Sequence, residues 1–279
     1  RKQRYMTLKY DLLIQGGRVI DPSQNIDSVA DVGFKDGLVL EINSDICADT
    51  ASNVINASNK LVTPGLIDLH GHFAFGMHPR DVDAEMVCTA NGITTCVDAG
   101  STGWINFPGF RRYIIDQSKT RIFAFLHISS MGSVVTSVLP VPDLEDFRLA
   151  REKESVKCIE DHQDIILGVK VRLTPSGTTL SNAIPAMQMA RRICDQTGTQ
   201  LMVHVMETPI SMNDVFTYLR PGDIATHVFH GDTHSILDSA GLVRPEVWDA
   251  YNSGIIFDTG GAARHCSFTI SQYAVNQGL

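Results

Sequence analysis

The sequence has 279 residues, of which 43% are hydrophobic, and its 31 acidic and 23 basic residues give a formal charge of −8. These values are typical of a globular protein with a large core and exclude a disordered or fibrous chain. The acidic balance argues against a nucleic-acid or anionic-membrane binder, because both need clustered Lys and Arg, and no apolar run approaches the roughly 20 residues of a membrane span.

The N-terminal residues RKQRY are basic but are not followed by an apolar stretch, so we expect no signal peptide and take Met6 as a candidate initiator. The cysteines form no C-x-x-C pair. Scattered cysteines of this kind are typical of small buried residues in a reducing compartment, which predicts a cytoplasmic location. The six cysteines are Cys47, Cys88, Cys96, Cys158, Cys194 and Cys266.

Residues 9–57 are rich in short β signals. The stretch YDLLIQGGRVID predicts a strand, a Gly-Gly turn and a second strand, and VGFKDGLVLEI repeats this plan with Asp-Gly at its turn. So few strands cannot bury both of their faces alone. We therefore expect a small antiparallel β unit over residues 1–60 that forms part of a composite β-sandwich.

From residue 61 onward, short β-branched runs alternate with longer helical segments, which predicts an α/β fold of parallel strands covered by helices. The predicted strands are 61–70, 92–100, 121–129, 165–172, 201–205, 223–229 and 254–259, and the clearest helices are 143–163, 182–198, 211–220 and 244–254. Seven such units predict a (β/α)8 TIM-type barrel over residues 61–279 that lacks its last strand in this chain. An open seven-stranded sheet is the alternative, but the polar residues at the strand ends favour the barrel.

The first strand of this series ends in TPGLIDLHGHF. Alternate residues of a strand share a face, so Asp68, His70 and His72 should point the same way. Two imidazoles at the C-terminal end of a parallel strand can bind one cation, and that end is the active-site face of a barrel. The other reading is a pair of hydrogen-bonded core histidines; the H-x-H spacing after an apolar strand favours a metal site.

The stretch LGVKVR places Lys170 and Arg172 on one face of a strand and two valines on the other. A lysine inside a barrel should be deprotonated or paired, because burial of an ammonium group is costly. A deprotonated lysine can add carbon dioxide to form a carbamate, an anionic ligand able to bridge two cations. In isolation, a solvated edge strand with a Lys/Arg face is the preferred explanation of this pattern; together with the H-x-H motif, the pattern favours a buried lysine.

Two further histidines, His204 in LMVHV and His227 in IATHVFHG, also lie near the C-terminal ends of predicted strands. One such placement would be unremarkable among ten histidines. Four imidazoles on three strands, together with a strand lysine, indicate a site for Zn²⁺ or a similar first-row ion.

The motifs PGLIDLHGH, VDAGSTG, GVKVR, LMVH, PGDIATHVFHG and RPEVWDAYNSGIIFD resemble the amidohydrolase superfamily, and within it the dihydroorotase-like deacetylase branch. The resemblance implies that His70 and His72 hold one metal, His204 and His227 hold the other, and carboxylated Lys170 bridges both as a catalytic group. It also implies two divalent ions, preferably Zn²⁺, and a small-molecule substrate whose amide, cyclic amide or acyl ester bond is cleaved by a hydroxide that bridges the metals. By the same reasoning, Asp68 is a candidate to orient an imidazole and Arg172 is a candidate for an anionic substrate group or a structural ion pair.

The sequence departs from this family at two places. The family's general acid–base is an Asp at the end of the eighth strand, which this chain lacks; Asp258 ends the seventh strand and is a weak substitute. The segment TGGAARHCSF also replaces the family's V-G-H-G and moves a histidine to position 265. We therefore expect the 279 residues to be weakly active or inactive as a hydrolase.

Two other functions stay open at this stage. One is a truncated, non-catalytic metal-binding remnant, and the other is a mononuclear deaminase on the same fold, against which the bridging Lys170 counts. The sequence is also compatible with a homo-oligomer, and it does not identify the substrate, since loops decide among activities that share one metal cage.

Overall fold

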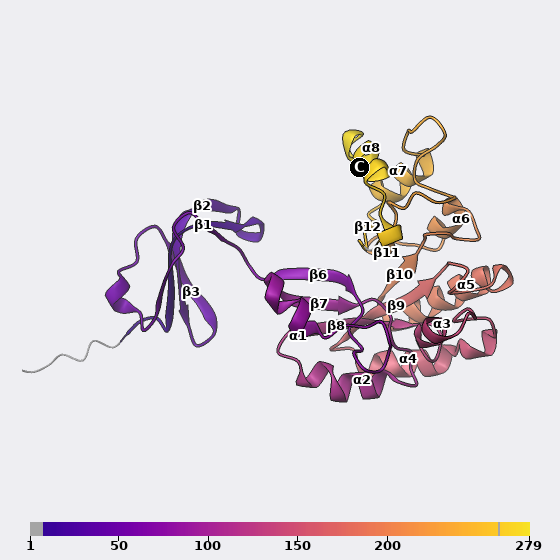
Figure 1. Ribbon diagram of the computed structural model, residues 1–279, viewed down its shortest axis with the longest axis horizontal. Coiled ribbons are helices and arrows are strands. Elements are labelled where there is room, and N and C mark those ends of the chain that lie inside the picture. Colours follow the sequence, from indigo (N-terminus) through magenta and orange to yellow (C-terminus); the bar gives the residue numbers. More distant parts are fainter. Residues whose placement is uncertain (1–7, 262) are drawn as a thin grey trace, which may run out of the picture. The chain divides into compact units, whose positions relative to one another are not determined.

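The computed structural model describes residues 8–261 and 263–279. The chain divides into two compact units, with the division between Leu66 and Ile67. Each unit has its own sheet: a five-stranded sheet in the first and a seven-stranded sheet in the second. Figure 1 shows both units coloured along the sequence.

The N-terminal unit is a mixed sheet in the order β3-β2-β1-β4, with β5 also paired to β1. Strands β1, β2 and β3 are antiparallel as predicted, and the β2–β3 turn lies at Asp36 and Gly37, both with positive φ. The purely antiparallel prediction is wrong for β4 and β5, which run parallel to β1. The five strands are β1 (Leu12–Asp21), β2 (Ile26–Lys35), β3 (Leu38–Asn43), β4 (Val54–Asn56) and β5 (Leu61–Val62).

The predicted Gly-Gly turn is also wrong, because β1 runs through it without a break. The register against β2 shifts between Ile14 and Gly17, so the glycines form a bulge inside the strand. Gly16 has φ +71°, which favours glycine. Its backbone N–H donates to the carboxylate of Asp31 at 2.8 Å, which stabilises the bulge.

The second unit contains seven strands in the order β6 to β12, and the pairings from β7 through β12 are parallel. Each lies within or beside a predicted strand, and together they form an incomplete TIM-type barrel. The strands are β6 (Leu66–Gly71), β7 (Ile93–Asp98), β8 (Arg121–His127), β9 (Ile166–Arg172), β10 (Gln200–His204), β11 (Ile224–Thr226) and β12 (Ile256–Asp258).

The helices follow the strands along the chain. They are α1 (Ala84–Val87), α2 (Phe107–Tyr113), α3 (Val134–Val138), α4 (Glu152–Asp161), α5 (Leu180–Thr197), α6 (Met212–Phe216), α7 (Pro245–Asn252) and α8 (Phe268–Asn276). The helix predicted over residues 143–163 is shorter in the structure, where α4 begins only at Glu152. In the segment before it, Asp146 accepts from the backbone N–H of Arg148 and caps a short 3-10 helix instead.

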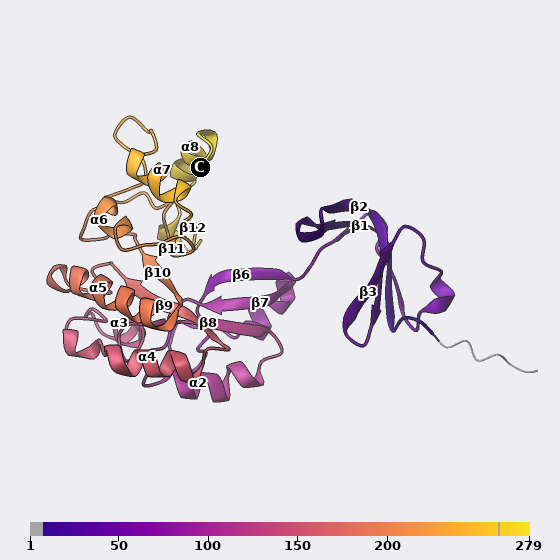
Figure 2. The same ribbon diagram turned by 180° about the vertical axis from the view of Figure 1, so that it is seen from behind.

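Alternation along β9 separates the two faces of the seven-stranded sheet. Val169 and Val171 belong to the large core that the strands share with α2, α4 and α5, whereas Lys170 lies on the other face. Helix α5 packs against β9 and β10, as Figure 2 shows from behind. The inner face below the strand ends is filled by a smaller apolar cluster that includes Phe125 and Met202.

Gly168 gives a direct test of this packing. A Cβ atom at position 168 would lie 1.9 Å from the carbonyl oxygen of Gln200, so backbone atoms would have to move. We expect Gly168→Ala to lower the free energy of unfolding by roughly 2 kcal/mol or more. Gly109→Ala in α2 is the control: its nearest neighbour is Met77 Cε at 3.7 Å, so urea denaturation should show no loss, or a gain of up to about 1 kcal/mol.

None of the helices in the described part of the chain combines the length and the apolar character that a membrane span requires.

Candidate metal centre

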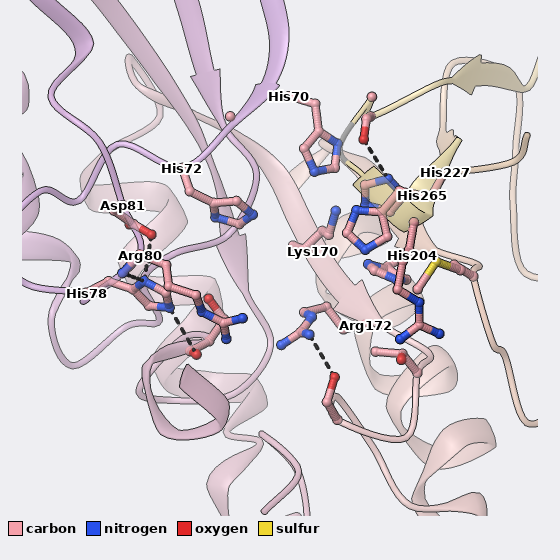
Figure 3. A pocket seen from close by; sticks show the side chains of 18 of the residues that line it. His70, His72, His78, Arg80, Asp81, Lys170, Arg172, His204, His227 and His265 are labelled. Atoms are coloured by element: carbon pink, nitrogen blue, oxygen red, sulfur yellow. Dashed lines mark hydrogen bonds and ion pairs between the residues drawn. The ribbon is translucent and has the colours of Figure 1, made fainter. Parts of the chain in front are cut away.

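A cavity of about 550 Å³ opens at the C-terminal ends of the seven strands, and its polar lining comes from several of them. All five predicted metal ligands line it: His70, His72, Lys170, His204 and His227. Figure 3 shows Lys170 between His70 and His72 on one side and His204, His227 and His265 on the other. The structure therefore brings together residues that lie up to 157 positions apart in the sequence, from 70 to 227.

His70 lies in β6, and its ring is hydrogen-bonded to residues of the two strands at the opposite edge of the sheet. Its Nδ1 lies 2.9 Å from Oδ2 of Asp258 in β12 and 2.8 Å from Oγ1 of Thr226 in β11. The Thr226 hydroxyl also donates to Asp258 at 2.5 Å. Burial disfavours the charged form of Asp258, but the hydrogen bonds from His70 and Thr226 outweigh it and lower its pKa to about 2.

These contacts correct the predicted role of Asp68. Its carboxylate accepts from the backbone N–H of His70 at 3.0 Å, whereas the imidazole contacts Asp258. Asp258, predicted only as a weak substitute for a missing acid–base, is therefore the carboxylate that orients this ring. This pairing could not be predicted from the sequence, because the two residues are 188 positions apart.

Asp258→Asn tests this orienting contact. An amide at this position keeps the size of the side chain but loses the negative charge that fixes the Nδ1–H tautomer of His70. We expect Zn²⁺ affinity to fall by about 10–100-fold with little change in the fold, since groups that hold a ligand in place contribute that much. Chelator competition would measure the affinity, and an unchanged Kd would contradict the role.

The second histidine of the pair, His72, follows directly after β6. Its Nδ1 lies 2.9 Å from the hydroxyl of Ser101, which fixes the ring from the neighbouring β7 loop. One ligand atom of His72 also lies within 4.8 Å of carboxylate oxygens of Asp81 and Asp98. Burial, together with the nearby Asp81, raises the pKa of Asp98 to about 6.

Lys170 is 1% exposed, and its Nζ has no hydrogen-bond partner in the part of the chain that the structure describes. Gly100 makes room for its side chain, because a Cβ there would lie 2.7 Å from Lys170 Cγ. Burial lowers the pKa of Lys170 to about 7, opposed in part by Asp258. A large share of the amine is therefore neutral near pH 7, as the sequence predicts for a buried lysine.

The lowered pKa of Lys170 gives a pH-dependent stability. Between pH 7 and 10.5 the unfolded chain binds a proton at this lysine and the folded chain does not, so stability rises with pH by roughly 1.4 kcal/mol per unit from this group. Lys170→Met should remove that slope. Urea denaturation of metal-free protein in carbon-dioxide-free buffer at several pH values would measure it, and parallel curves for both proteins would refute the assignment.

His204 is the last residue of β10, and His227 is the first residue after β11. Their ring centroids are 4.3 Å apart. The Nδ1 of His227 lies 3.1 Å from the carbonyl oxygen of Gly260, a contact that places the proton on Nδ1. His204 Nε2 is buried with no hydrogen-bond partner among the described residues. His227 also has φ +65°, a conformation that non-glycine residues adopt rarely and that concentrates at functional sites.

His265 is the site residue whose position the sequence did not reveal. The altered loop after β12 brings it to the cavity, where its ring centroid lies 4.2 Å from that of His227 and 5.3 Å from that of His204. Ligand atoms of these three histidines lie within 4.8 Å of one another. The sequence signal was the departure from the family's V-G-H-G in the segment TGGAARHCSF, which moves a histidine to position 265.

Arg172 lines the cavity and also forms the structural ion pair that the sequence left open. Its Nη1 donates to Oδ2 of Asp143 at 2.6 Å, and Nη2 donates to Ser176. Asp143 is fully buried and also lies 3.6 Å from His127 Nε2. Two more arginines, Arg80 and Arg264, line the same cavity, which gives it positive charge beside the imidazoles.

The donor set suits a divalent cation. Burial lowers the pKa of every one of the five clustered imidazoles, to about 4 for His70 and well below the usual value for His72 and His204. These rings are therefore neutral at pH 7, and each can donate a nitrogen lone pair to a cation. Lys170 Nζ and His204 Nε2 have no hydrogen-bond partner within residues 8–261 and 263–279, and a bound cation would offset the desolvation cost that this carries. Neutral imidazoles favour Zn²⁺ and similar ions.

The chain is similar to deacetylases, and its fold is similar to those of a deaminase and a dihydroorotase. A deacetylase from Agrobacterium fabrum is 33% identical over 250 residues, which cover 88% of this chain and 59% of the deacetylase. The crystal structure of an adenine deaminase matches with a TM-score of 0.87 at 27% identity, over 97% of this chain and 71% of that one. A dihydroorotase structure matches with a TM-score of 0.83 at 29% identity, over 96% and 69%.

A comparison with models of known protein families gives no match. The chain spans about three fifths of the length of the curated deacetylases that it matches, 59% for the protein from A. fabrum and 60% for one from Brucella anthropi.

Proposed function

Because the chain belongs to the amidohydrolase superfamily, among its deacetylase- and dihydroorotase-like members, we propose that it is a metal-dependent hydrolase of an amide, cyclic amide or acyl ester bond. The observation that carries the proposal is the buried amine of Lys170, which lies between two groups of imidazoles and has no hydrogen-bond partner among the described residues. A structural lysine would be expected to have a carboxylate partner at this depth.

In this proposal His70 and His72 hold one divalent cation, and His204 and His227 hold the other. The neutral amine of Lys170 attacks the carbon of CO₂; one N–C bond forms, one N–H proton passes to solvent, and the product is an anionic carbamate. Its two oxygens give the cavity a negative ligand between the imidazole groups, which also removes the cost of an unpartnered amine.

Divalent cations held there would supply Lewis acidity toward a carbonyl group and would lower the pKa of a water molecule. Residues of the chain itself orient the histidine rings and bind the substrate. Asp258 and Ser101 keep the His70 and His72 rings in place through Nδ1. Arg172, held by Asp143, offers its guanidinium to an anionic part of the substrate.

Substrate turnover tests the proposal. Protein loaded with Zn²⁺ in bicarbonate buffer is assayed against an N-acetyl amino acid, a cyclic amide such as dihydroorotate and an aryl acetate, beside metal-free protein. We expect a weak Zn²⁺-dependent rate with at least one class, lost in His204→Ala and kept in His234→Ala, which changes an exposed histidine. Metal binding without turnover of any of these substrate classes would contradict the proposed hydrolase and leave a protein that only binds metal.

A second candidate function is hydrolytic deamination, because the adenine deaminase structure has the higher TM-score of the two described above. This reaction replaces an exocyclic amine with oxygen and releases ammonia, and its set of metal ligands differs only in that it does not use the lysine. Ammonia release from adenine by the Zn²⁺-loaded protein, with one metal per chain and no effect of Lys170→Met, would favour deamination over the proposed hydrolysis.

A further inference from the structure

We propose that His265 is a third imidazole ligand, which together with His204 and His227 forms a complete three-nitrogen cation site within the cavity. This inference rests on the proposed function in one respect, that the cavity binds divalent cations, and goes beyond it by adding a ligand from the altered loop after β12. Three protein ligands with one open position form a common arrangement in catalytic zinc sites.

The three rings converge on one small volume. Their ligand atoms lie within 4.8 Å of one another, and the ring centroids are separated by 4.3 Å, 4.2 Å and 5.3 Å. Figure 3 shows His265 beside His227 and above His204. Each ring comes from a different segment: the end of β10, the residue after β11 and the loop before α8.

The nitrogens available in this group also fit a cation. His204 Nε2 and His265 Nδ1 are buried and have no hydrogen-bond partner among the described residues. His227 directs Nδ1 to the carbonyl oxygen of Gly260, so its Nε2 keeps the lone pair. An unpartnered buried nitrogen costs stability, and two of them next to a third neutral imidazole are explained by one shared cation.

Contacts on both sides of His265 hold its loop against the cavity. Arg264 donates to Glu207 at 2.6 Å, and the backbone N–H of Ser267 donates to the carbonyl oxygen of Phe229 at 2.8 Å. A Cβ at Gly260 would lie 2.3 Å from His227 Nδ1, so glycine is required there for the loop to pass close to the ring. The loop is therefore positioned to present His265.

The ligand count distinguishes this site from the one at His70 and His72. Three imidazoles need no carbamate to hold a cation, so the site should fill first and should keep its cation in Lys170→Met. The site at His70 and His72 depends on the bridging group in the proposed function, and should lose occupancy in that variant.

Cobalt and zinc binding test the role of His265. In His265→Ala, and in the more size-conserving His265→Gln, we expect the Kd for the first Zn²⁺ to rise at least about tenfold by chelator competition, since even residues that only orient a ligand contribute 10–100-fold. The visible absorption of bound Co²⁺ should change with the loss of a nitrogen donor. Added imidazole should restore the affinity of His265→Ala. His234→Ala, an exposed histidine, is the matched control.

Two results would overturn the inference. One is wild-type Zn²⁺ affinity in both His265 variants, and the other is weakened affinity with the wild-type Co²⁺ spectrum, which would make His265 a structural residue. His204→Ala separates this failure from that of the proposed function: if it loses Zn²⁺ while the His265 variants do not, only the third ligand is wrong. If none of these variants changes metal binding, both proposals fail.

Discussion

Replacing both His70 and His72 with alanine is expected to lower the metal content from two divalent cations per chain to at most one. The two imidazoles line the same cavity, and each is fixed through Nδ1, by Asp258 or by Ser101. With the Nδ1 atoms occupied in this way, Nε2 is the ligand atom, and removal of both rings leaves the cation with the lysine bridge alone. Elemental analysis after loading with Zn²⁺ and gel filtration would measure the loss.

The matched control for this experiment is a double variant of two histidines outside the cavity, His162→Ala with His234→Ala. His162 contacts Arg111 and lies beside Phe107, and His234 is exposed. This control should retain both cations. Unchanged metal content in the His70 and His72 double variant would refute the role proposed for these residues.

The second large effect is expected at Lys170. In the wild-type protein, bicarbonate should promote uptake of the second cation, because the neutral amine gains a carboxylate when it adds CO₂. Lys170→Met keeps the length and apolar stem but cannot form a carbamate, so uptake should no longer respond to bicarbonate, and the affinity for the second cation should fall by about tenfold or more. Titration with Zn²⁺ at low and high bicarbonate would measure both.

Lys157→Met is the control for this experiment, since Lys157 is exposed and pairs with Asp161 on α4. It should bind cations as the wild type does. Equal dependence on bicarbonate in wild type and Lys170→Met would contradict the carbamate, and strong uptake of both cations by Lys170→Met would contradict the bridge.

The alternation of the strands could be predicted from the sequence because each strand is a short β-branched run between helical segments. The same alternation placed Lys170 opposite Val169 and Val171, and the structure has these residues on opposite faces of the sheet. Residues at the C-terminal ends of parallel strands meet at one edge of a sheet. Together with the curvature of the sheet, this rule brings His70, His204 and the other predicted ligands to one cavity.

Other features could not be read from local patterns. A Gly-Gly pair has the composition of a turn, and only the pairing of β1 with β2 shows that it is a bulge. The parallel pairing of β4 and β5 with β1 likewise depends on contacts distant in sequence. The Asp258–His70 contact joins the last strand of the sheet to its first and so depends on the curvature of the sheet. The approach of His265 to His227 depends on the path of the loop after β12.

The proposed metal centre holds two cations in one cavity, among imidazoles from separate strands and around Lys170. The most direct measurement is an anomalous difference map from a crystal of the Zn²⁺-loaded protein, recorded at the zinc absorption edge. We predict two peaks, one at the His70 and His72 rings and one at the His204 and His227 rings, with density for a carboxylated Lys170 between them. Peaks elsewhere, or no peak in this cavity, would contradict it.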